Sequence, residues 1–418
     1  MSSGFRLSAT SSLFVALLCG CGTTVDSLGY NDQSQPGVTS LGPLSPRGPY
    51  PNPFRDVLGK TDAEISAKLE ATFAQLFHGD ADHTIYYAEG TGQAYIKDIL
   101  HGDIRTEGIG YGMIITVELN KRTEFDALWT YAKNKLKYTT GSYAGYFLSS
   151  CDKTATSIEP CIDPFGHEQF VMALIFAHDR WKSNTGAINY AADAQELLHV
   201  MRFKEEDNGG VVGGITNSFD DATLLAYDVP NQSAATYTRP SVEMPNYYEL
   251  WAEATGDPFW TQAATAARAF WQKAANANTG LMPQRATLAD ATPWAGSENF
   301  VAECYRTHLS LVLDRIWFGS YQWEVEEANK LLTFFYGKGF DTYNSSYTLD
   351  GVTALDTFHD APLVAVNGAT AVIATMDQRA AFIDATWNLP PAIYPPRYYT
   401  GLMHLLSLLI LSGQYQVY

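Results

Sequence analysis

Glu107 lies in residues 103–113, between Arg105 and a run that contains three glycines, and it enters an apolar pattern typical of a helix. Glycine lets a backbone approach a ligand or adopt φ > 0, so a neighbouring carboxyl can become partly buried. Burial raises the pKa of a carboxyl and suits it to donate a proton near neutral pH. The plainer interpretation is a charged residue favoured at a helix N-terminus by the macrodipole, and residue chemistry alone favours that interpretation.

Other acidic residues stand in turns or at the starts of helical patterns: Asp163 and Glu168 in 163–168, Asp220 and Asp221 in 217–221, Glu303 in 302–306, and Asp341 and Asp350 in 341–351. Each has a structural interpretation as a helix cap, an Asx turn or an intrahelical Glu–Arg pair. Glu107 and Glu303, however, each open an apolar helix. Glycoside hydrolysis needs such a pair, because one carboxylic acid protonates the leaving oxygen while a second carboxylate activates water or attacks the sugar.

Composition restricts the possible partners. The chain has 418 residues, 46% of them hydrophobic and 17% charged, which is enough for a large core. Its formal net charge of −18 argues against nucleic acid, whose binding depends on Lys and Arg at the phosphates. The 25 Tyr, 21 Phe and 9 Trp side chains permit stacking on sugar rings, but aromatic side chains also fill ordinary cores.

The N-terminal segment is typical of an exported protein. Arg6 precedes a short apolar run at residues 13–18, and Leu18-Cys19-Gly20-Cys21 resembles a bacterial lipoprotein signal cleaved before Cys21. An ordinary secretory signal cut nearby is the alternative. We therefore expect a signal peptide over 1–21, a flexible tether over 22–54 rich in Ser, Gly, Pro, Thr and Asn, and an extracytoplasmic domain over 55–418. The lipid on Cys21 would attach this domain to a bacterial membrane.

Three cysteines remain in the body of the chain: Cys151, Cys161 and Cys304. In an oxidising compartment Cys151 and Cys161 can close a loop, which would leave Cys304 over, although the sequence does not establish the pairing. We see no Cys/His spacing of a structural zinc site and no phosphate-binding glycine loop. We expect no metal and no cofactor.

Helical periodicity dominates from Thr61 onward, with about twelve helical stretches. They lie near 61–77, 109–120, 122–138, 167–183, 189–202, 243–256, 258–275, 300–317, 322–338, 361–375, 378–388 and 398–412. Some stretches, such as residues 401–411, are apolar nearly all round and must be buried on every side, whereas others carry a polar face. This alternation predicts an all-α toroid with six inner and six outer helices in one domain. The loops at one end of such a toroid would frame a cleft.

The segment around Glu107, Asp-Ile-Arg-Thr-Glu-Gly-Ile-Gly-Tyr-Gly-Met, resembles the acid motif of glycoside hydrolase family 8, Arg-Ser-Glu-Gly-x-x-Tyr-Gly-Met. Other segments resemble the xylan-active branch of that family, which includes endo-xylanases and reducing-end xylose-releasing exo-oligoxylanases. These segments are 94–99, 168–174, 244–251, 279–283, 347–351 and 397–401. The resemblance implies an (α/α)6 barrel, an inverting mechanism, no metal and a β-1,4-linked substrate.

The resemblance also implies roles for individual residues. Glu107 falls on the general acid, and Glu303 falls where the family has an aspartate as the base. Phe165 takes the place of an aspartate that helps to position sugar and water, and we expect it to put an apolar wall against the sugar. Asp163, two residues earlier, is a second candidate base. Thr400 stands where an aspartate is common. We expect further cleft residues at Tyr111, Asp220, Tyr248 and Arg306.

The departures from the family pattern have physical consequences. Glutamate for aspartate at 303 adds about 1.5 Å of reach, and a misplacement of about 1 Å can cost roughly a hundredfold in rate. We therefore expect a monomeric inverting hydrolase that acts on xylan or xylo-oligosaccharides. Two alternatives stay open: a catalytically weakened surface lipoprotein that binds glycans, and a β-glucanase or chitosanase.

Overall fold

A computed structural model of the chain describes residues 41–418, except 152–156, 160–161, 183–187 and 320. Its α-helices are α1 Pro53–Asp56, α2 Asp62–His78, α3 Thr106–Glu118, α4 Arg122–Tyr131, α5 Pro164–Trp181, α6 Tyr190–Asn208, α7 Pro245–Thr255, α8 Pro258–Ala274, α9 Tyr305–Phe318, α10 Gln322–Gly337, α11 Ala361–Thr370, α12 Arg379–Trp387 and α13 Arg397–Leu411. A π-helical turn, Ala132–Leu136, follows α4, and a 3₁₀ turn, Ala302–Cys304, precedes α9. The twelve longer helices correspond to the twelve predicted stretches.

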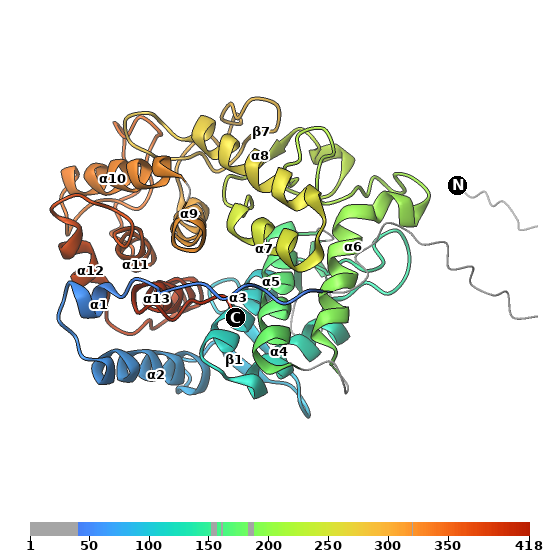
Figure 1. The fold of residues 1–418 in the computed structure, drawn as a ribbon, viewed down its shortest axis with the longest axis horizontal. Helices are drawn as coiled ribbons and strands as arrows, with labels where there is room; N and C mark the ends of the chain where they lie inside the picture. Colours follow the sequence, from blue (N-terminus) through green and yellow to red (C-terminus); the bar gives the residue numbers. More distant parts are fainter. Residues whose placement is uncertain (1–40, 152–156, 160–161, 183–187, 320) are drawn as a thin grey trace, which may run out of the picture. The chain divides into compact units, whose positions relative to one another are not determined.

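These twelve helices form two concentric rings. Helices α3, α5, α7, α9, α11 and α13 pack each on the next, and α13 packs back on α3 to close the inner ring. Helices α2, α4, α6, α8, α10 and α12 lie outside them, each against an inner helix (Figure 1). Nearly every residue of α3 and of α13 is buried, and for α13 the all-round apolar sequence of residues 401–411 predicted this. The (α/α)6 barrel is therefore confirmed.

Local sequence signals explain several helix starts. Thr61 and Glu64 form a capping box on α2, and the Asp257 side chain caps α8 ahead of a proline at the first position. The structure differs from the sequence prediction at α3, which begins at Thr106 rather than near 109. It also differs before α9, where the 3₁₀ turn separates Glu303 from the helix. Both differences lie where loop backbone turns into a helix. Hydrophobic periodicity does not locate the first residue of a helix, because the first turn need not bury an apolar face.

Two small antiparallel sheets lie between the helices. The larger has the order β1 Tyr86–Ala88, β2 Ala94–Asp98, β3 Asp103–Arg105, β4 Ser150–Cys151 and β5 Ser157–Glu159. The smaller pairs β6 Tyr237–Thr238 with β7 Ala286–Thr287. Strand β3 runs directly into α3, and the N–H of Thr106 donates to the carbonyl of Ser149 at 3.0 Å. The larger sheet thus fixes the start of α3.

Residues 41–52, called here the N-terminal strap, correct the predicted tether of 22–54. Gly42 N–H donates to the carbonyl of Ala254, and Leu44 N–H donates to Asp179 Oδ2 at 3.0 Å. Arg47 pairs with Glu253 at 2.6 Å. Since these partners lie at the C-terminal ends of α5 and α7, the strap crosses that end of the inner ring (Figure 1). Residues 1–40, with the predicted signal and Cys21, lie outside the described residues.

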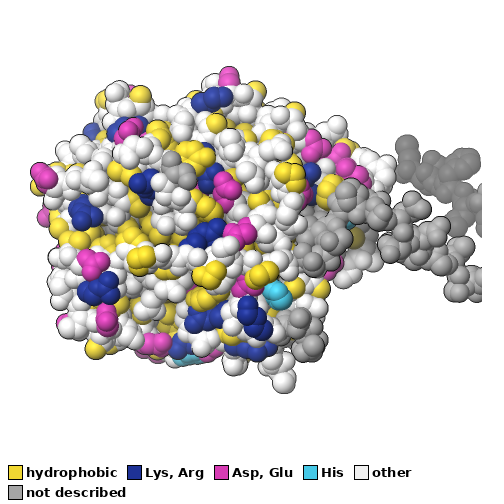
Figure 2. Space-filling model, in the orientation of Figure 1, with side chains coloured by type: hydrophobic (Ala, Val, Ile, Leu, Met, Phe, Trp, Pro, Cys, Tyr) yellow, Lys and Arg dark blue, Asp and Glu magenta, His cyan; other side chains and the backbone are white. Residues whose placement is uncertain are grey.

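On the face shown in Figure 2, Lys and Arg side chains are interspersed with Asp and Glu, and no patch of one sign covers the described part of that face. Within the described residues, none of the helices combines the length and the apolar character that a membrane crossing needs. Cys151 is buried in β4, whereas Cys161 lies outside the described residues, so its pairing stays a prediction.

Candidate active site

The N-terminal ends of the inner helices bring the acidic residues together. Glu107 lies in the first turn of α3, Asp163 caps α5, Glu303 lies in the 3₁₀ turn before α9, and Asp360 precedes α11. All four line one cleft of about 680 Å³. The strap lies at the opposite ends of these helices. The three residues predicted from sequence as catalytic, Glu107, Glu303 and Asp163, therefore share one site.

The glycines that follow Glu107 let neighbouring helices pack closely against α3. None of Gly108, Gly110 and Gly112 has a positive φ. A Cβ on Gly108 would lie 2.5 Å from a ring carbon of Tyr398, and one on Gly110 would lie 2.5 Å from Gln169 Cβ. The glycines thus admit side chains of α13 and α5 rather than a ligand. This close packing sets the position of α3, and with it the position of Glu107.

Glu107 has two hydrogen-bond partners in the cleft. Arg306 Nη1 donates to its Oε1 at 2.9 Å, and the Tyr398 hydroxyl donates to its Oε2 at 3.1 Å. Burial raises the pKa of Glu107, and the nearby Arg306 cation offsets only part of that rise. A buried carboxyl with a raised pKa retains its proton closer to neutral pH, as a general acid requires.

Glu303 lies on the other side of the same arginine, in the opposite electrostatic state. Gln284 Nε2 donates to its Oε2 at 2.7 Å, while its Oε1 faces Arg306 Nη2 at 3.8 Å and Arg239 Nη1 at 4.0 Å. Burial alone would raise the pKa of Glu303, but Arg306, Arg239, Gln284 and Arg285 outweigh it and lower the pKa to about 2. Glu303 is therefore ionised and able to accept a proton.

Arg306 joins the two glutamates. It contacts Glu107 through Nη1 at 2.9 Å and Glu303 through Nη2 at 3.8 Å. Because both nitrogens belong to one planar guanidinium, the nearest oxygens of the two glutamates lie within about 9 Å of each other. Inverting glycosidases separate their carboxyls by roughly 6.5–9.5 Å to leave room for water. The bound is compatible with that spacing.

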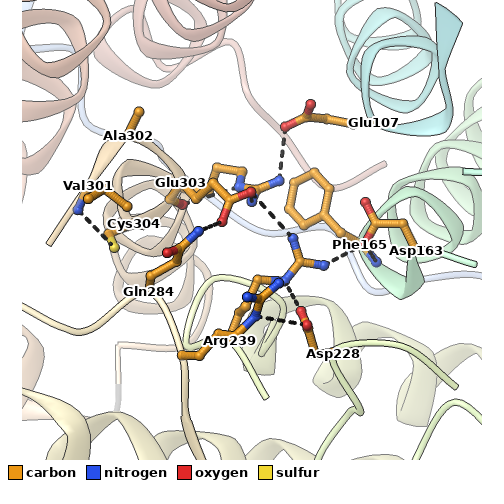
Figure 3. A network of polar contacts seen from close by, with 12 residues as sticks. Glu107, Asp163, Phe165, Asp228, Arg239, Gln284, Val301, Ala302, Glu303 and Cys304 are labelled. Carbon is orange, nitrogen blue, oxygen red and sulfur yellow. Dashed lines mark hydrogen bonds and ion pairs between the residues drawn. The ribbon is translucent and has the colours of Figure 1, made fainter. Parts of the chain in front are cut away.

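Asp163 belongs to a second set of contacts beside Glu303. Its Oδ1 accepts from the N–H of Phe165 at 3.3 Å, which caps α5, and from Arg239 Nη2 at 2.6 Å. Arg239 also forms an ion pair with the buried Asp228 (Figure 3). Arg285 Nε contacts the second oxygen of Asp228 at 3.0 Å. Arg239, which faces Glu303, is thus held by two aspartates, and one of these also binds Arg285.

Phe165 and Tyr111 lie beneath the cleft. Phe165 is only 1% exposed, and its ring centre lies 4.4 Å from the guanidinium carbon of Arg306. The buried ring of Tyr111 meets that of Phe165 edge to face. Neither is among the described residues that line the cleft. In place of the expected apolar wall against sugar, the Phe165 ring supports the arginine that joins the two glutamates.

Two other predicted cleft residues lie away from the cleft lining. The Tyr248 hydroxyl donates to Glu168 Oε1 at 2.7 Å inside the barrel core. Asp220 accepts from Thr223 and from the Tyr227 hydroxyl within its own turn. Neither Tyr248 nor Asp220 is among the described residues that line the cleft. The predicted Arg306 does line it, and so does Thr400, which stands where an aspartate is common in the family.

Sequence reasoning missed several cleft residues, Arg239, Asp228, Arg285, His101 and Tyr398, and it also missed Gln284, which donates to Glu303. Tyr398 belongs to the motif at 397–401, so that motif could have singled it out. No spacing points to Arg239, whose partner Asp163 lies 76 positions away. Among the described residues, no group of three or more His, Cys, Asp or Glu side chains is arranged to hold a metal ion.

Comparison with known proteins identifies the family. The model of the glycosyl hydrolases family 8 matches residues 96–413. The chain belongs to glycosyl hydrolase family 8. This family 8 glycosidase is 32% identical over 380 residues to the reducing-end xylose-releasing exo-oligoxylanase Rex8A of Paenibacillus barcinonensis. The alignment covers 89% of this chain and 97% of that protein.

Two further matches agree. The reducing end xylose-releasing exo-oligoxylanase of Halalkalibacterium halodurans is 34% identical over 380 residues, covering 88% of this family 8 chain and 94% of that protein. A family 8 structure from Teredinibacter turnerae, in complex with xylobiose, superposes with a TM-score of 0.83 at 31% identity and covers 88% of this chain and 97% of that one.

Proposed function

We propose that this family 8 glycosidase hydrolyses β-1,4-linked xylo-oligosaccharides or xylan with inversion, Glu107 acting as the general acid and Glu303 as the general base. The observation that carries the proposal is the pair of opposite pKa shifts on the two sides of Arg306, upward for Glu107 and downward for Glu303. Such a separation assigns one carboxyl to donate a proton and the other to accept one.

The reaction balances within this pair. Glu107 gives its proton to the glycosidic oxygen as the bond from that oxygen to the anomeric carbon breaks. Water forms the new bond to the anomeric carbon from the opposite face and gives its proton to Glu303. Arg306 contacts both glutamates. The single negative charge of the pair therefore passes from Glu303 to Glu107 during the reaction and stays next to the same arginine. Exchange with solvent then restores the starting protonation states.

Short xylo-oligosaccharides are the substrate that the relatives support best, because the two relatives compared above are reducing-end xylose-releasing exo-oligoxylanases. The lipoprotein-like segment ending at Cys21 supports a place of action outside the cytoplasm, on a lipid anchor. A β-glucan or chitosan substrate and glycan binding without cleavage remain the alternatives to be tested.

The decisive experiment compares the wild type with Glu107→Gln on xylotriose, xylotetraose and xylan, with products separated by chromatography. We expect xylose release by the wild type and a loss of about 10²–10⁴-fold in Glu107→Gln, since general acid catalysis contributes that much. NMR of fresh product should show the α-anomer. Glu118→Gln is the matched control, because Glu118 lies on the same helix at the end away from the cleft.

Other outcomes decide between the alternatives. Cleavage of β-glucan or chitosan in place of xylan would transfer the same mechanism to another substrate. A wild-type protein that binds one of these glycans but releases no sugar would establish the binding alternative. Equal loss of activity in Glu107→Gln and Glu118→Gln would contradict the role assigned to Glu107.

A further inference from the structure

Arg239 is a cleft residue with no assigned role, and its guanidinium faces three carboxylates from three separate loops. It lies between β6 and α7 with its side chain only 9% exposed. Nη2 contacts Asp163 Oδ1 at 2.6 Å, Nε pairs with Asp228, and Nη1 faces Glu303 Oε1 at 4.0 Å. A buried arginine with such partners is held in one orientation, because its planar fork matches carboxylate geometry.

The contacts on the far side of the guanidinium anchor it. Asp228 is buried, and both of its oxygens are engaged, one by Arg239 and the other by Arg285 Nε at 3.0 Å. Asp163 is tied twice through Oδ1, to Arg239 and to the N–H of Phe165 at the start of α5. The loop before α5 is therefore coupled, through Arg239, to the loop that carries Asp228.

Glu303 differs from Asp163 in having an oxygen open to the cleft. Its Oε2 accepts from Gln284, but among the described residues its Oε1 accepts no hydrogen bond. The two nearest cationic nitrogens, at 3.8 and 4.0 Å, lie beyond hydrogen-bond distance. Arg306 Nη2, buried and without a hydrogen-bond partner, points at the same gap. Glu303 Oε1 is thus left facing the cleft beside two cationic nitrogens.

We propose that Arg239 is a positioning residue for the hydrolysis: it ties Asp163 back to Asp228 and holds Glu303 charged and facing the attacking water. This inference rests on the proposed function, because it needs Glu303 to act as the base. It explains how a base with a longer side chain than aspartate can be aimed. Gln284 fixes one oxygen of Glu303, and the two arginines define where the other points.

The test separates the charge of Arg239 from its shape. Gln284 donates a hydrogen bond to Glu303. The groups that act electrostatically on Glu303 are Glu107 from α3, Arg239 from the loop before α7, Arg285 near β7, Cys304 and Arg306 at α9, and Tyr399 from α13. In Arg239→Gln the remaining arginines still act, but one cation is lost, so the pKa of Glu303 rises. The acid limb of the kcat/KM profile on xylotriose should then move up by roughly 1 pH unit or more.

Arg239→Lys should give a different result. An ammonium keeps the positive charge, so the acid limb should stay close to that of the wild type. A single point charge cannot bind Asp163 and Asp228 as a planar fork does, so kcat should fall about tenfold or more. Together the two variants distinguish the electrostatic contribution from the geometric one.

Arg268→Gln is the matched control. Arg268 is also buried and binds two carboxylates, Asp314 and Glu249, but it is not among the described residues that line the cleft. Its replacement should lower the thermal midpoint and leave the pH profile of kcat/KM unchanged. Circular dichroism of each variant confirms that the folded protein is being compared.

An acid limb that stays in place in Arg239→Gln, with kcat reduced no more than in Arg268→Gln, would overturn the proposal and leave Arg239 a structural ion pair. Failure of the proposed function appears differently. In that case the wild type itself cleaves none of the xylo-oligosaccharides, and both proposals fall together. A wild type that cleaves, with an unshifted Arg239→Gln, removes only the role of Arg239.

Discussion

Gly108 leaves room for the Tyr398 side chain, which contacts Glu107. A Cβ at this position would lie 2.5 Å from a ring carbon of Tyr398 and 2.8 Å from its hydroxyl oxygen, and that hydroxyl donates to Glu107. Gly108→Ala should therefore displace Tyr398 and lower kcat/KM by about 10–100-fold. Helix propensity favours the alanine by roughly 1 kcal/mol, so a loss of activity would not reflect a weaker helix.

Gly112→Ala is the control for this prediction. Its Cβ would meet Leu128 at 2.9 Å on the outer side of α3, away from Glu107. We expect it to lower stability and to leave the pH dependence and kcat of the folded protein near those of the wild type. If both alanine variants lost activity equally, the contact between Tyr398 and Glu107 would not be the reason.

At this scale the sequence identified what depends on local context and missed what depends on loops meeting in space. Glu107 and Glu303 each stand at the start of an apolar helix, so their neighbours along the chain marked them. Arg239 gains its meaning only when Asp163 and Asp228 are brought to it. Phe165 was placed against the sugar because its slot is polar in the family, but its ring is buried under Arg306.

At the scale of elements, the N-terminal strap is an extended segment without hydrophobic periodicity, and we expect it to stabilise the folded protein. Leu44 is only 4% exposed, and its N–H donates to Asp179 at the end of α5. Leu44→Ala should lower the free energy of unfolding by about 2–4 kcal/mol, because it leaves a cavity against the ends of the inner helices. Urea denaturation of the full chain measures this loss.

The control for the strap is Val352→Ala, at a loop position that is 76% exposed. Its free energy of unfolding should change by no more than about 0.5 kcal/mol. A Leu44→Ala variant as stable as Val352→Ala would mean that the strap is a passive tether, as its composition suggested. Helices can be predicted from a 3.6-residue hydrophobic period. An extended strap that hydrogen-bonds to helix ends has no such period, so the sequence does not reveal it.

At the scale of the whole molecule, closing the barrel buries carboxyls that the reaction does not use. Burial raises the pKa of Glu118 to about 8 and that of Glu327 to about 7, and it raises the pKa values of Glu168 and Glu243 well above the usual range. Glu118 illustrates the cause, because its Oε1 is buried without a hydrogen-bond partner. Each of these groups is neutral in the folded protein at a pH where the unfolded chain is ionised.

The sign of the resulting pH dependence follows from proton binding. Above about pH 4.5 the unfolded chain has lost these protons, while the folded protein keeps the proton of Glu118 until about pH 8. The folded state therefore binds more protons, and stability falls as pH rises across that window. The buried histidines His167, His308 and His404 have lowered pKa values of about 4, 3 and 4, so above about pH 7 they are neutral in both states and add no slope.

We therefore expect the thermal midpoint of the wild type to fall between pH 7 and pH 9. In Glu118→Gln the amide needs no ionisation, so its midpoint should exceed that of the wild type by a margin that grows from pH 5 to pH 8, to roughly 2 °C or more. Glu326→Gln, at an exposed position on α10, should follow the wild type throughout. Parallel curves for wild type and Glu118→Gln would show that Glu118 ionises in the folded barrel as freely as in the unfolded chain. The end of the barrel that holds the strap and the C-terminus would then be open to water rather than closed by them.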